Sequence, residues 1–254
     1  MIGAPRGLGL AIAEGYLAKG AHVVATVRGP SHTAQHQIQE AFASRLDIEA
    51  VDISIPEQIA GLHDRLATRR FDLLFVSAGI PNDPQETVAD ASTEEFSRLM
   101  VTNALSPLRA IEAFKDLVTF AGTIAIMSSG QGSIGNNTRG GFEICRASRA
   151  ALNQLMRSYA ARQHDDPRTL LLARVGCSIP ASVGRMRRPP SETACPHCCE
   201  QSMTSTVEAA CNSLTTSAGL SPGQAGHPTM PQRLHGMPRQ KIVAPRHKWV
   251  DDFA

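Results

Sequence analysis

The sequence predicts an α/β protein with a doubly wound parallel sheet over residues 1–174, followed by a poorly ordered C-terminal tail. Short, nearly continuous apolar runs alternate with helical patterns, and a glycine-rich turn precedes the first helical pattern. Such apolar runs are typical of parallel strands that are buried on both faces. The 254 residues are enough for one domain with a sizeable core.

Five segments are predicted to be strands because they are short and rich in aliphatic residues. They are Ala21–Val27, Ile48–Asp52, Phe71–Ser77, Thr123–Met127 and Thr169–Ala173. Four segments have a helical period, namely Leu8–Ala18, Pro56–Ala67, Thr93–Phe114 and Cys145–Arg162. This alternation predicts right-handed βαβ units. A further, central strand is expected at the start, but only Met1 and Ile2 precede the glycine turn, so this strand is very short or the true start lies upstream.

Composition and charge exclude several classes of protein. The net charge of +2 is close to neutral, whereas an obligate nucleic-acid binder carries a concentrated basic face. No signal peptide is recognisable at the start, and no apolar run is long enough to cross a membrane. We therefore expect a cytoplasmic protein with no nucleic-acid partner and no membrane partner, whose cysteines are thiols.

The first motif that indicates chemistry is the glycine-rich turn. Its sequence is Gly3-Ala4-Pro5-Arg6-Gly7-Leu8-Gly9, which has the pattern G-x-x-x-G-x-G ahead of a helix. Glycines allow the backbone to turn sharply and to approach a pyrophosphate, which then meets the positive end of the helix. The strand expected at Ala21–Val27 follows the helix at a suitable distance, so the motif predicts a dinucleotide site.

The residue after that strand indicates which dinucleotide is bound. A site for NAD would have an acidic residue here, but the chain has Arg28. Together with Arg6, Arg28 favours the 2′-phosphate of NADP, with NAD as the alternative cofactor and solvated surface arginines as the non-functional alternative. Asp52, followed by Ile53, is placed to accept a hydrogen bond from the adenine amino group, or is an ordinary residue of a turn.

Five motifs in order resemble those of the short-chain dehydrogenase/reductase family. They are the glycine turn, the run Ser77-Ala78-Gly79-Ile80 after a strand, Asn103 in a helix, Ser129 after the next strand, and Cys145 with Arg149 on the following helix. The resemblance covers residues 1 to about 174. It implies a Rossmann-type fold, a nicotinamide cofactor and a small-molecule carbonyl or alcohol substrate. It also implies a homodimer built on the long helices Thr93–Phe114 and Cys145–Arg162.

The resemblance also implies a catalytic tetrad, from which this chain departs. In the family, serine binds the substrate oxygen, tyrosine transfers the proton, lysine holds the ribose and lowers the tyrosine pKa, and asparagine orders a water. Ser129 and Asn103 match the serine and the asparagine, but Cys145 and Arg149 replace the tyrosine and the lysine. The i, i+4 spacing still places both residues on one helix face.

Three outcomes follow from these replacements. The leading hypothesis is an NADP-dependent oxidoreductase whose carbonyl reduction is impaired, because a thiol is too short to replace the phenol of tyrosine. The alternative is a non-catalytic nucleotide-binding or interaction protein on the same scaffold. A third alternative is a product that does not fold stably. A new role for Cys145 as a nucleophile is weaker than its interpretation as a small apolar residue.

The tail differs in composition from the first 176 residues. Residues 177–254 contain nine of the sixteen prolines and five of the six cysteines, and they show no clear period. We interpret 1–176 as the nucleotide-binding domain and 177–254 as an irregular tail, either disordered or translated out of frame. The run Cys195-Pro196-His197-Cys198-Cys199 contains C-x-x-C without a second pair, so we expect no metal, with zinc as the alternative.

Overall fold

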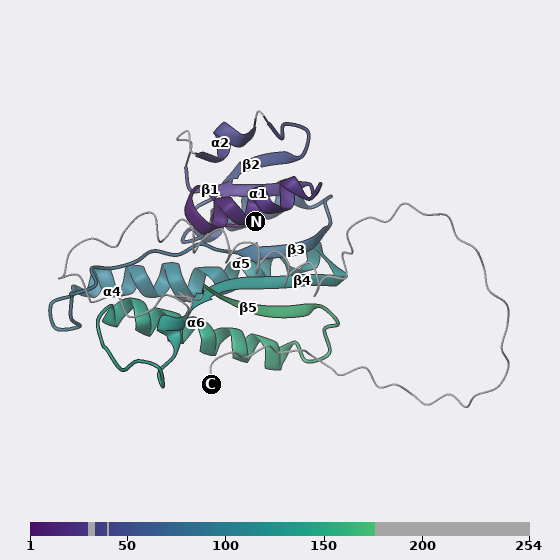
Figure 1. Ribbon diagram of the computed structural model, residues 1–254. Coiled ribbons are helices and arrows are strands. Elements are labelled where there is room, and N and C mark those ends of the chain that lie inside the picture. The colour runs from purple at the N-terminus through teal and green to yellow at the C-terminus, as the bar shows by residue number, and fades with distance from the viewer. Residues whose placement is uncertain (30–33, 40, 176–254) are drawn as a thin grey trace, which may run out of the picture.

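The computed structural model of this chain describes residues 1–29, 34–39 and 41–175. The irregular tail expected at 177–254, with its cysteine cluster, lies outside the described residues. Strands and helices alternate along the described part of the chain (Figure 1). The strands are β1 (Val23–Val27), β2 (Leu46–Ala50), β3 (Phe71–Val76), β4 (Val118–Ser129) and β5 (Thr169–Val175). The α-helices are α1 (Gly7–Ala18), α2 (Ala34–Gln39), α3 (Pro56–Leu66), α4 (Thr93–Met100), α5 (Ser106–Phe114) and α6 (Glu143–Arg162).

The strands are parallel and form two groups that the first residues of the chain hold together. β1 pairs with β2, and β3, β4 and β5 pair in that order. The amino group of Met1 donates to Val24 O of β1 at 2.6 Å, while Ile2 N donates to Phe75 O of β3 at 2.8 Å and Ser77 N donates to Ile2 O at 2.8 Å. The N-terminus therefore lies between β1 and β3 (Figure 1). The very short central strand is present as a single bridge between Ile2 and Val76.

Side chains of alternating strand residues point to opposite faces of this sheet, and each face has its own helices. One face packs Leu74, Ile124 and neighbouring residues against α3, α5 and α6. The other face packs Phe75, Ala125 and neighbouring residues against α1. Two apolar faces explain why the strands are nearly continuous apolar runs. The prediction of a doubly wound α/β sheet is confirmed.

The single helix predicted at Thr93–Phe114 is wrong in one respect, because α4 and α5 are separated by a π-helical segment at Val101–Leu105. Pro107 lies at the start of α5 and has no backbone N–H to donate to the carbonyl four residues earlier, which belongs to Asn103. A π-helical turn accommodates such a break in the hydrogen-bond ladder. The candidate residue Asn103 therefore lies in the irregular part of this helix.

Other element boundaries differ from the prediction by small shifts as well as by extension. The strand expected from Ala21 begins at Val23 as β1, and the strand expected at Ile48–Asp52 is Leu46–Ala50 as β2, so Asp52 lies just beyond it. The strand expected at Thr123–Met127 is longer at both ends as β4, and the helix expected from Cys145 begins at Glu143. The short helix α2 has too few apolar residues to show a period and was not expected. None of these changes moves a strand to another place in the sheet.

Candidate active site

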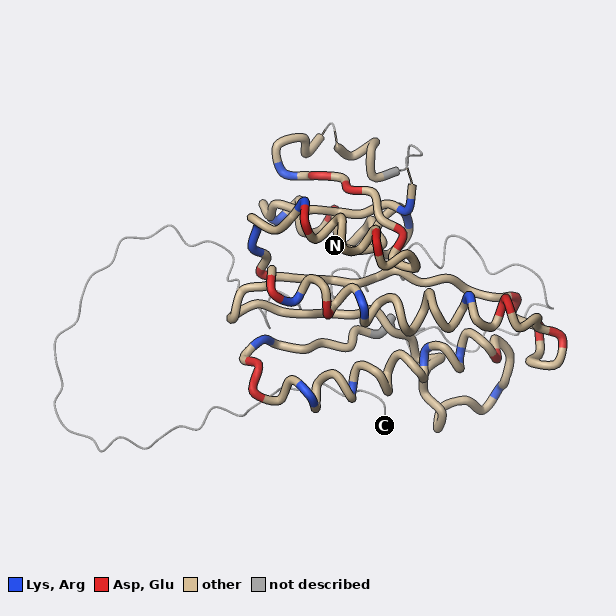
Figure 2. Tube along the Cα trace, turned by 180° about the vertical axis from the view of Figure 1, so that it is seen from behind, with Lys and Arg blue, Asp and Glu red and all other residues tan. Residues whose placement is uncertain are grey.

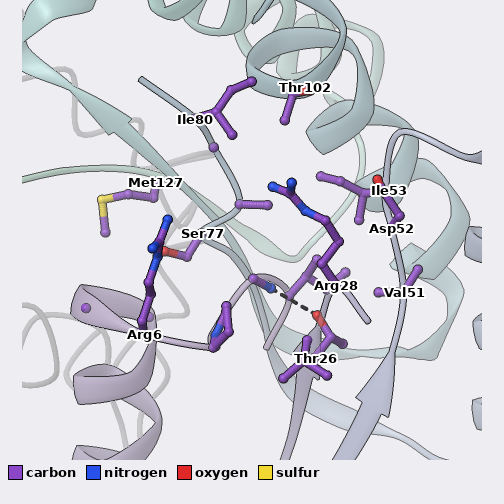
Figure 3. Close-up of a pocket in the computed structure, with 18 of the residues that line it drawn as sticks. Arg6, Thr26, Arg28, Val51, Asp52, Ile53, Ser77, Ile80, Thr102 and Met127 are labelled. Carbon is purple, nitrogen blue, oxygen red and sulfur yellow. Dashed lines mark hydrogen bonds between the residues drawn. The ribbon is translucent and has the colours of Figure 1, made fainter. Parts of the chain in front are cut away.

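A cavity of about 380 Å³ opens where β1, β2 and β3 end and α1 begins (Figure 3). All eleven residues predicted to bind the cofactor line it: Gly3, Arg6, Gly7, Leu8, Gly9, Arg28, Asp52, Ile53, Ser77, Ala78 and Gly79. The carboxyl ends of parallel strands meet at one edge of a sheet, so motifs distant in the sequence converge there. The sequence prediction therefore corresponds to one continuous cavity.

Glycine is required at two positions of the turn that forms the cavity wall. Gly3 has a φ of +82°, and a Cβ atom there would lie 2.6 Å from Ala78 N. A Cβ atom at Gly9 would lie 2.4 Å from Gly3 O. Gly3 N also donates to Thr26 Oγ1 at 3.0 Å, which fixes the start of the turn (Figure 3). The turn is packed so tightly that only hydrogen atoms fit at these positions, and the backbone can approach a phosphate closely.

Two arginines give the cavity its positive charge. The side chains of Arg6 and Arg28 extend into it from different walls (Figure 3). Among the described residues, neither guanidinium forms an ion pair with an acidic side chain. Asp52 is held in place because its Oδ1 accepts hydrogen bonds from Ser54 N at 2.8 Å and Ser54 Oγ at 2.6 Å. The residues present fit a dinucleotide with an additional phosphate near the arginines.

Cys145 and Ser129 both contact Gln131, which follows β4. The Cys145 side chain is only 6% exposed, and its Sγ donates to Gln131 Oε1 at 3.4 Å. Ser129 Oγ accepts a hydrogen bond from Gln131 N at 3.2 Å. The neighbouring Ser128 is instead buried and donates to Asn153 Oδ1 at 2.6 Å. Of the two serines, it is therefore Ser129 that shares a hydrogen-bond partner, Gln131, with Cys145.

Arg149 lies between the cysteine and the cofactor cavity. Its Nη1 donates to Met127 O at 3.2 Å, and a Cβ atom placed on Gly79 would be 2.3 Å from its Nη2. Burial lowers the pKa of the Arg149 guanidinium, and the nearby Cys145 acts in the opposite direction. Because Met127 and Gly79 both line the cavity, Arg149 packs directly behind its wall.

Asn103 is fully buried and uses its whole side chain to connect two elements. Its Nδ2 donates to Ile80 O at 2.9 Å and to Ser148 Oγ at 3.0 Å, and its Oδ1 accepts from Ile80 N at 2.8 Å. Ser148 Oγ in turn donates to Cys145 O at 2.8 Å. This network joins the segment after β3 to α6 and so fixes the cavity wall relative to the cysteine.

Sequence reasoning missed several residues of the site. Ser148, Gln131 and Asn82, whose Oδ1 accepts from Cys145 N at 3.3 Å, position the cysteine and the asparagine. Their only signal was a polar residue within a few positions of a motif, which many surface residues share. The cavity also includes strand-end and neighbouring residues that were not predicted, namely Ile2, Pro5, Thr26, Val27, Val51, Ile80, Thr102 and Met127.

Charged residues of both signs are mixed along the described part of the chain. Lysine and arginine are interspersed with aspartate and glutamate on the backbone trace (Figure 2). No helix in that part is both long and apolar enough to span a bilayer.

Comparison with known proteins identifies relatives of this chain. A family model described as enoyl-(acyl carrier protein) reductase matches residues 3–166. A protein from Burkholderia multivorans, described as a short-chain dehydrogenase/reductase and solved with bound NADP, is 43% identical, with a TM-score of 0.74. That comparison covers 86% of this chain and 90% of the other. A carbonyl reductase from Pseudomonas aeruginosa PAO1 in complex with NADP is 29% identical over the same shares, with a TM-score of 0.73.

A relative with a named substrate matches over a shorter region. The 1-hydroxy-2-glutathionyl-2-methyl-3-butene dehydrogenase of Rhodococcus sp. (strain AD45) is 33% identical over 107 residues. These residues are 41% of this chain, and the match spans less than half of that enzyme, 46% of its length.

Proposed function

This chain belongs to the short-chain dehydrogenase/reductase family of oxidoreductases, and we propose that it binds NADP and transfers a hydride between the nicotinamide and a small carbonyl or alcohol substrate at a reduced rate. The observation that carries the proposal is one cavity that contains the glycine turn and two arginines, neither of which has an ion-pair partner among the described residues. Two similar structures hold NADP, which supports the same cofactor here.

The residues around the cavity each have a part in cofactor binding. The backbone of the turn from Gly3 to Gly9 receives the pyrophosphate at the start of α1. Arg6 and Arg28 hold the 2′-phosphate, where charge-assisted hydrogen bonds favour a phosphate over a hydroxyl. Asp52 accepts a hydrogen bond from the adenine, since Ser54 fixes its carboxylate in place. The bound nicotinamide supplies or accepts the hydride.

Catalysis is the impaired step in this proposal. Ser129 Oγ is the group that binds the substrate oxygen, and Cys145 is the residue at the position of the proton donor. Cys145 Sγ donates to Gln131 Oε1. A thiol is several ångströms shorter than a phenol, so we expect it to fall short of an oxygen held by Ser129. The Arg149 guanidinium donates to Met127 O behind the cavity wall, which orients it less directly toward a ribose than a lysine ammonium.

A second candidate function is a nucleotide-binding protein without turnover. It is favoured by the buried Cys145 and by the Asn103 side chain, whose oxygen and nitrogen are already bonded to Ile80 and Ser148. Such a protein would keep NADP affinity and respond to the coenzyme through the connection between β3 and α6.

Cofactor titration and turnover of the same sample test both candidates. We expect the unaltered chain to bind NADPH more tightly than NADH, measured by calorimetry. We expect Cys145→Tyr with Arg149→Lys to raise carbonyl-dependent NADPH oxidation by about 10²–10⁴-fold, because positioned acid–base catalysis has this magnitude.

The single variant Arg149→Lys is the matched control for this comparison and should not restore turnover alone. Binding of NADPH without turnover in either form would favour the second candidate. Failure of a folded chain to bind either reduced coenzyme would refute both.

The domain boundary near residue 176, a cytoplasmic location and a homodimer are also part of this proposal. The buried free thiol of Cys145 is compatible with a reducing compartment. Phe96 on α4, Leu105 in the π-helical segment and Leu155 on α6 are exposed apolar side chains, at 39%, 38% and 40% of their surface. In the proposed dimer these side chains would lie between the two copies and out of water. Sedimentation of Leu155→Glu beside the unaltered chain tests the dimer.

A further inference from the structure

A second, polar pocket adjoins the candidate catalytic residues. It has a volume of about 280 Å³ and lies between the turn after β4, the loop before α6 and the first turn of α6. Its lining is Gly130, Gln131, Asn136, Thr138, Arg139 and Arg146. Gln131 is also the residue that contacts Cys145 and Ser129, so the pocket begins next to the place where a substrate carbonyl would react.

The lining of this pocket is unusual in charge. Two arginines and three uncharged polar side chains face it, with no acidic and no apolar side chain among the lining residues. Within the described part of the chain, neither Arg139 nor Arg146 is in an ion pair. The nearby carboxylate of Glu143 accepts a hydrogen bond from Val88 N at 2.9 Å and does not line the pocket. Two like charges at one pocket repel each other, and an anion between them relieves this repulsion.

One of the two guanidinium groups is held in a defined position. Arg146 Nε donates to Gly141 O at 2.8 Å and its Nη2 donates to Gly140 O at 3.2 Å. These bonds use Nε and Nη2 and leave Nη1 as the remaining donor group of this lining residue. Arg139, on the loop, is exposed and free to adjust to a ligand. A fixed donor beside an adjustable one suits a carboxylate, which accepts two hydrogen bonds in a fork arrangement.

We propose that this pocket binds a carboxylate of the substrate, so that the protein selects carbonyl compounds that also carry a carboxylate. The proposal rests on the proposed function for its location beside Ser129 and Cys145. It assigns Arg139 and Arg146 as specificity-determining residues, which hold one end of the substrate and take no part in proton transfer.

The test compares matched acids and esters. The affinities of 4-oxopentanoate and 5-oxohexanoate and of their methyl esters are measured by calorimetry or saturation-transfer NMR, with and without saturating NADPH. We expect the unaltered chain to bind at least one acid about tenfold or more tightly than its ester, because a hydrogen bond to a charged group is worth that much. Arg139→Ala and Arg146→Ala should each remove most of this preference.

Arg70→Ala is the matched control, since it removes the same charge from an exposed arginine whose hydrogen bonds go to Ala67 O and Arg69 O. It should leave the preference intact. Arg146→Ala also removes the two hydrogen bonds from Arg146 to the loop. If Arg146→Ala unfolds, Arg139→Ala, which breaks no such bond, tests the role of the pocket.

Equal affinity for acid and ester, no binding of either, or an equal loss of preference in Arg70→Ala and Arg139→Ala would overturn the proposal. The NADPH titration is read separately. A chain that binds NADPH but shows no acid preference refutes only the carboxylate pocket, whereas a chain that prefers the acid but binds no NADPH refutes only the proposed function.

Discussion

The cofactor cavity and the catalytic end of this protein differ in how they depend on single side chains. The cavity is formed by backbone turns and strand ends, and all of its predicted residues line one space. The proposed catalytic end would require particular side chains to reach particular atoms. There, Cys145 Sγ donates to Gln131 Oε1 and Arg149 Nη1 donates to Met127 O. Nucleotide binding is therefore expected to be the more robust property, and catalysis the one that two substitutions weaken.

The largest further effect is expected from pH, which changes the free energy of unfolding. It acts through the amino group of Met1, which bonds to β1 in the part of the chain that forms the cofactor cavity. In protein prepared so that Met1 is its first residue, burial lowers the pKa of the Met1 amino group from 8.0 to about 5. Between pH 8 and pH 5 the unfolded chain therefore carries a proton that the folded chain lacks, so stability falls as pH falls, by about 1.4 kcal/mol per pH unit. Urea unfolding across this range measures the slope.

The matched control for this prediction is the chain with an acetylated N-terminus, which cannot titrate there and should give a shallower slope. The carboxylates of Asp166 and Glu112 have lowered pKa values, so their stabilising contribution is lost only at more acidic pH. Identical slopes for the free and the acetylated amine would contradict the prediction.

The next largest effect is expected at Gly9, where the glycine turn folds back on itself. Gly9→Ala places a Cβ atom 2.4 Å from Gly3 O, so the turn must shift. Overpacking of this kind costs about 1–3 kcal/mol, and the shift should also weaken NADPH binding. Gly135→Ala, which has no atom within 4 Å of the added Cβ, is the control for melting temperature and affinity. Equal behaviour of the two variants would show that the turn is not tightly packed.

The smallest effect is expected from Arg28→Ala, and it sharpens the cofactor assignment. The Kd for NADPH should rise about tenfold, because a charge-assisted hydrogen bond to the 2′-phosphate is lost. The Kd for NADH should stay the same, since that coenzyme has no phosphate at this position. Fluorescence titration with both coenzymes measures the difference, with Arg70→Ala as a charge-matched control. A loss of affinity that is equal for both coenzymes would remove Arg28 from the phosphate site.

Much of the cofactor cavity could be predicted because the sequence patterns that indicate it are local. Glycines at fixed spacing before a helix, and polar or glycine residues directly after apolar strands, are visible in the sequence, and parallel topology brings them to one edge. The same logic placed Arg28 and Asp52 in the cavity. The break in the helix at Asn103 was also encoded locally, by Pro107 four residues later, but it was not recognised.

The sequence by itself determined the α/β alternation and the position of the glycine turn, and it is the basis of our proposal that Cys145 and Arg149 replace two family side chains. Only the tertiary structure decided that Gln131 joins Ser129 to Cys145, that Ser148 holds Asn103, and that Arg149 packs behind Gly79. The physical reason is the distance along the chain over which each kind of interaction acts. Periodicity and turn chemistry act over a few residues, whereas contacts between separate elements depend on how helices pack on the sheet.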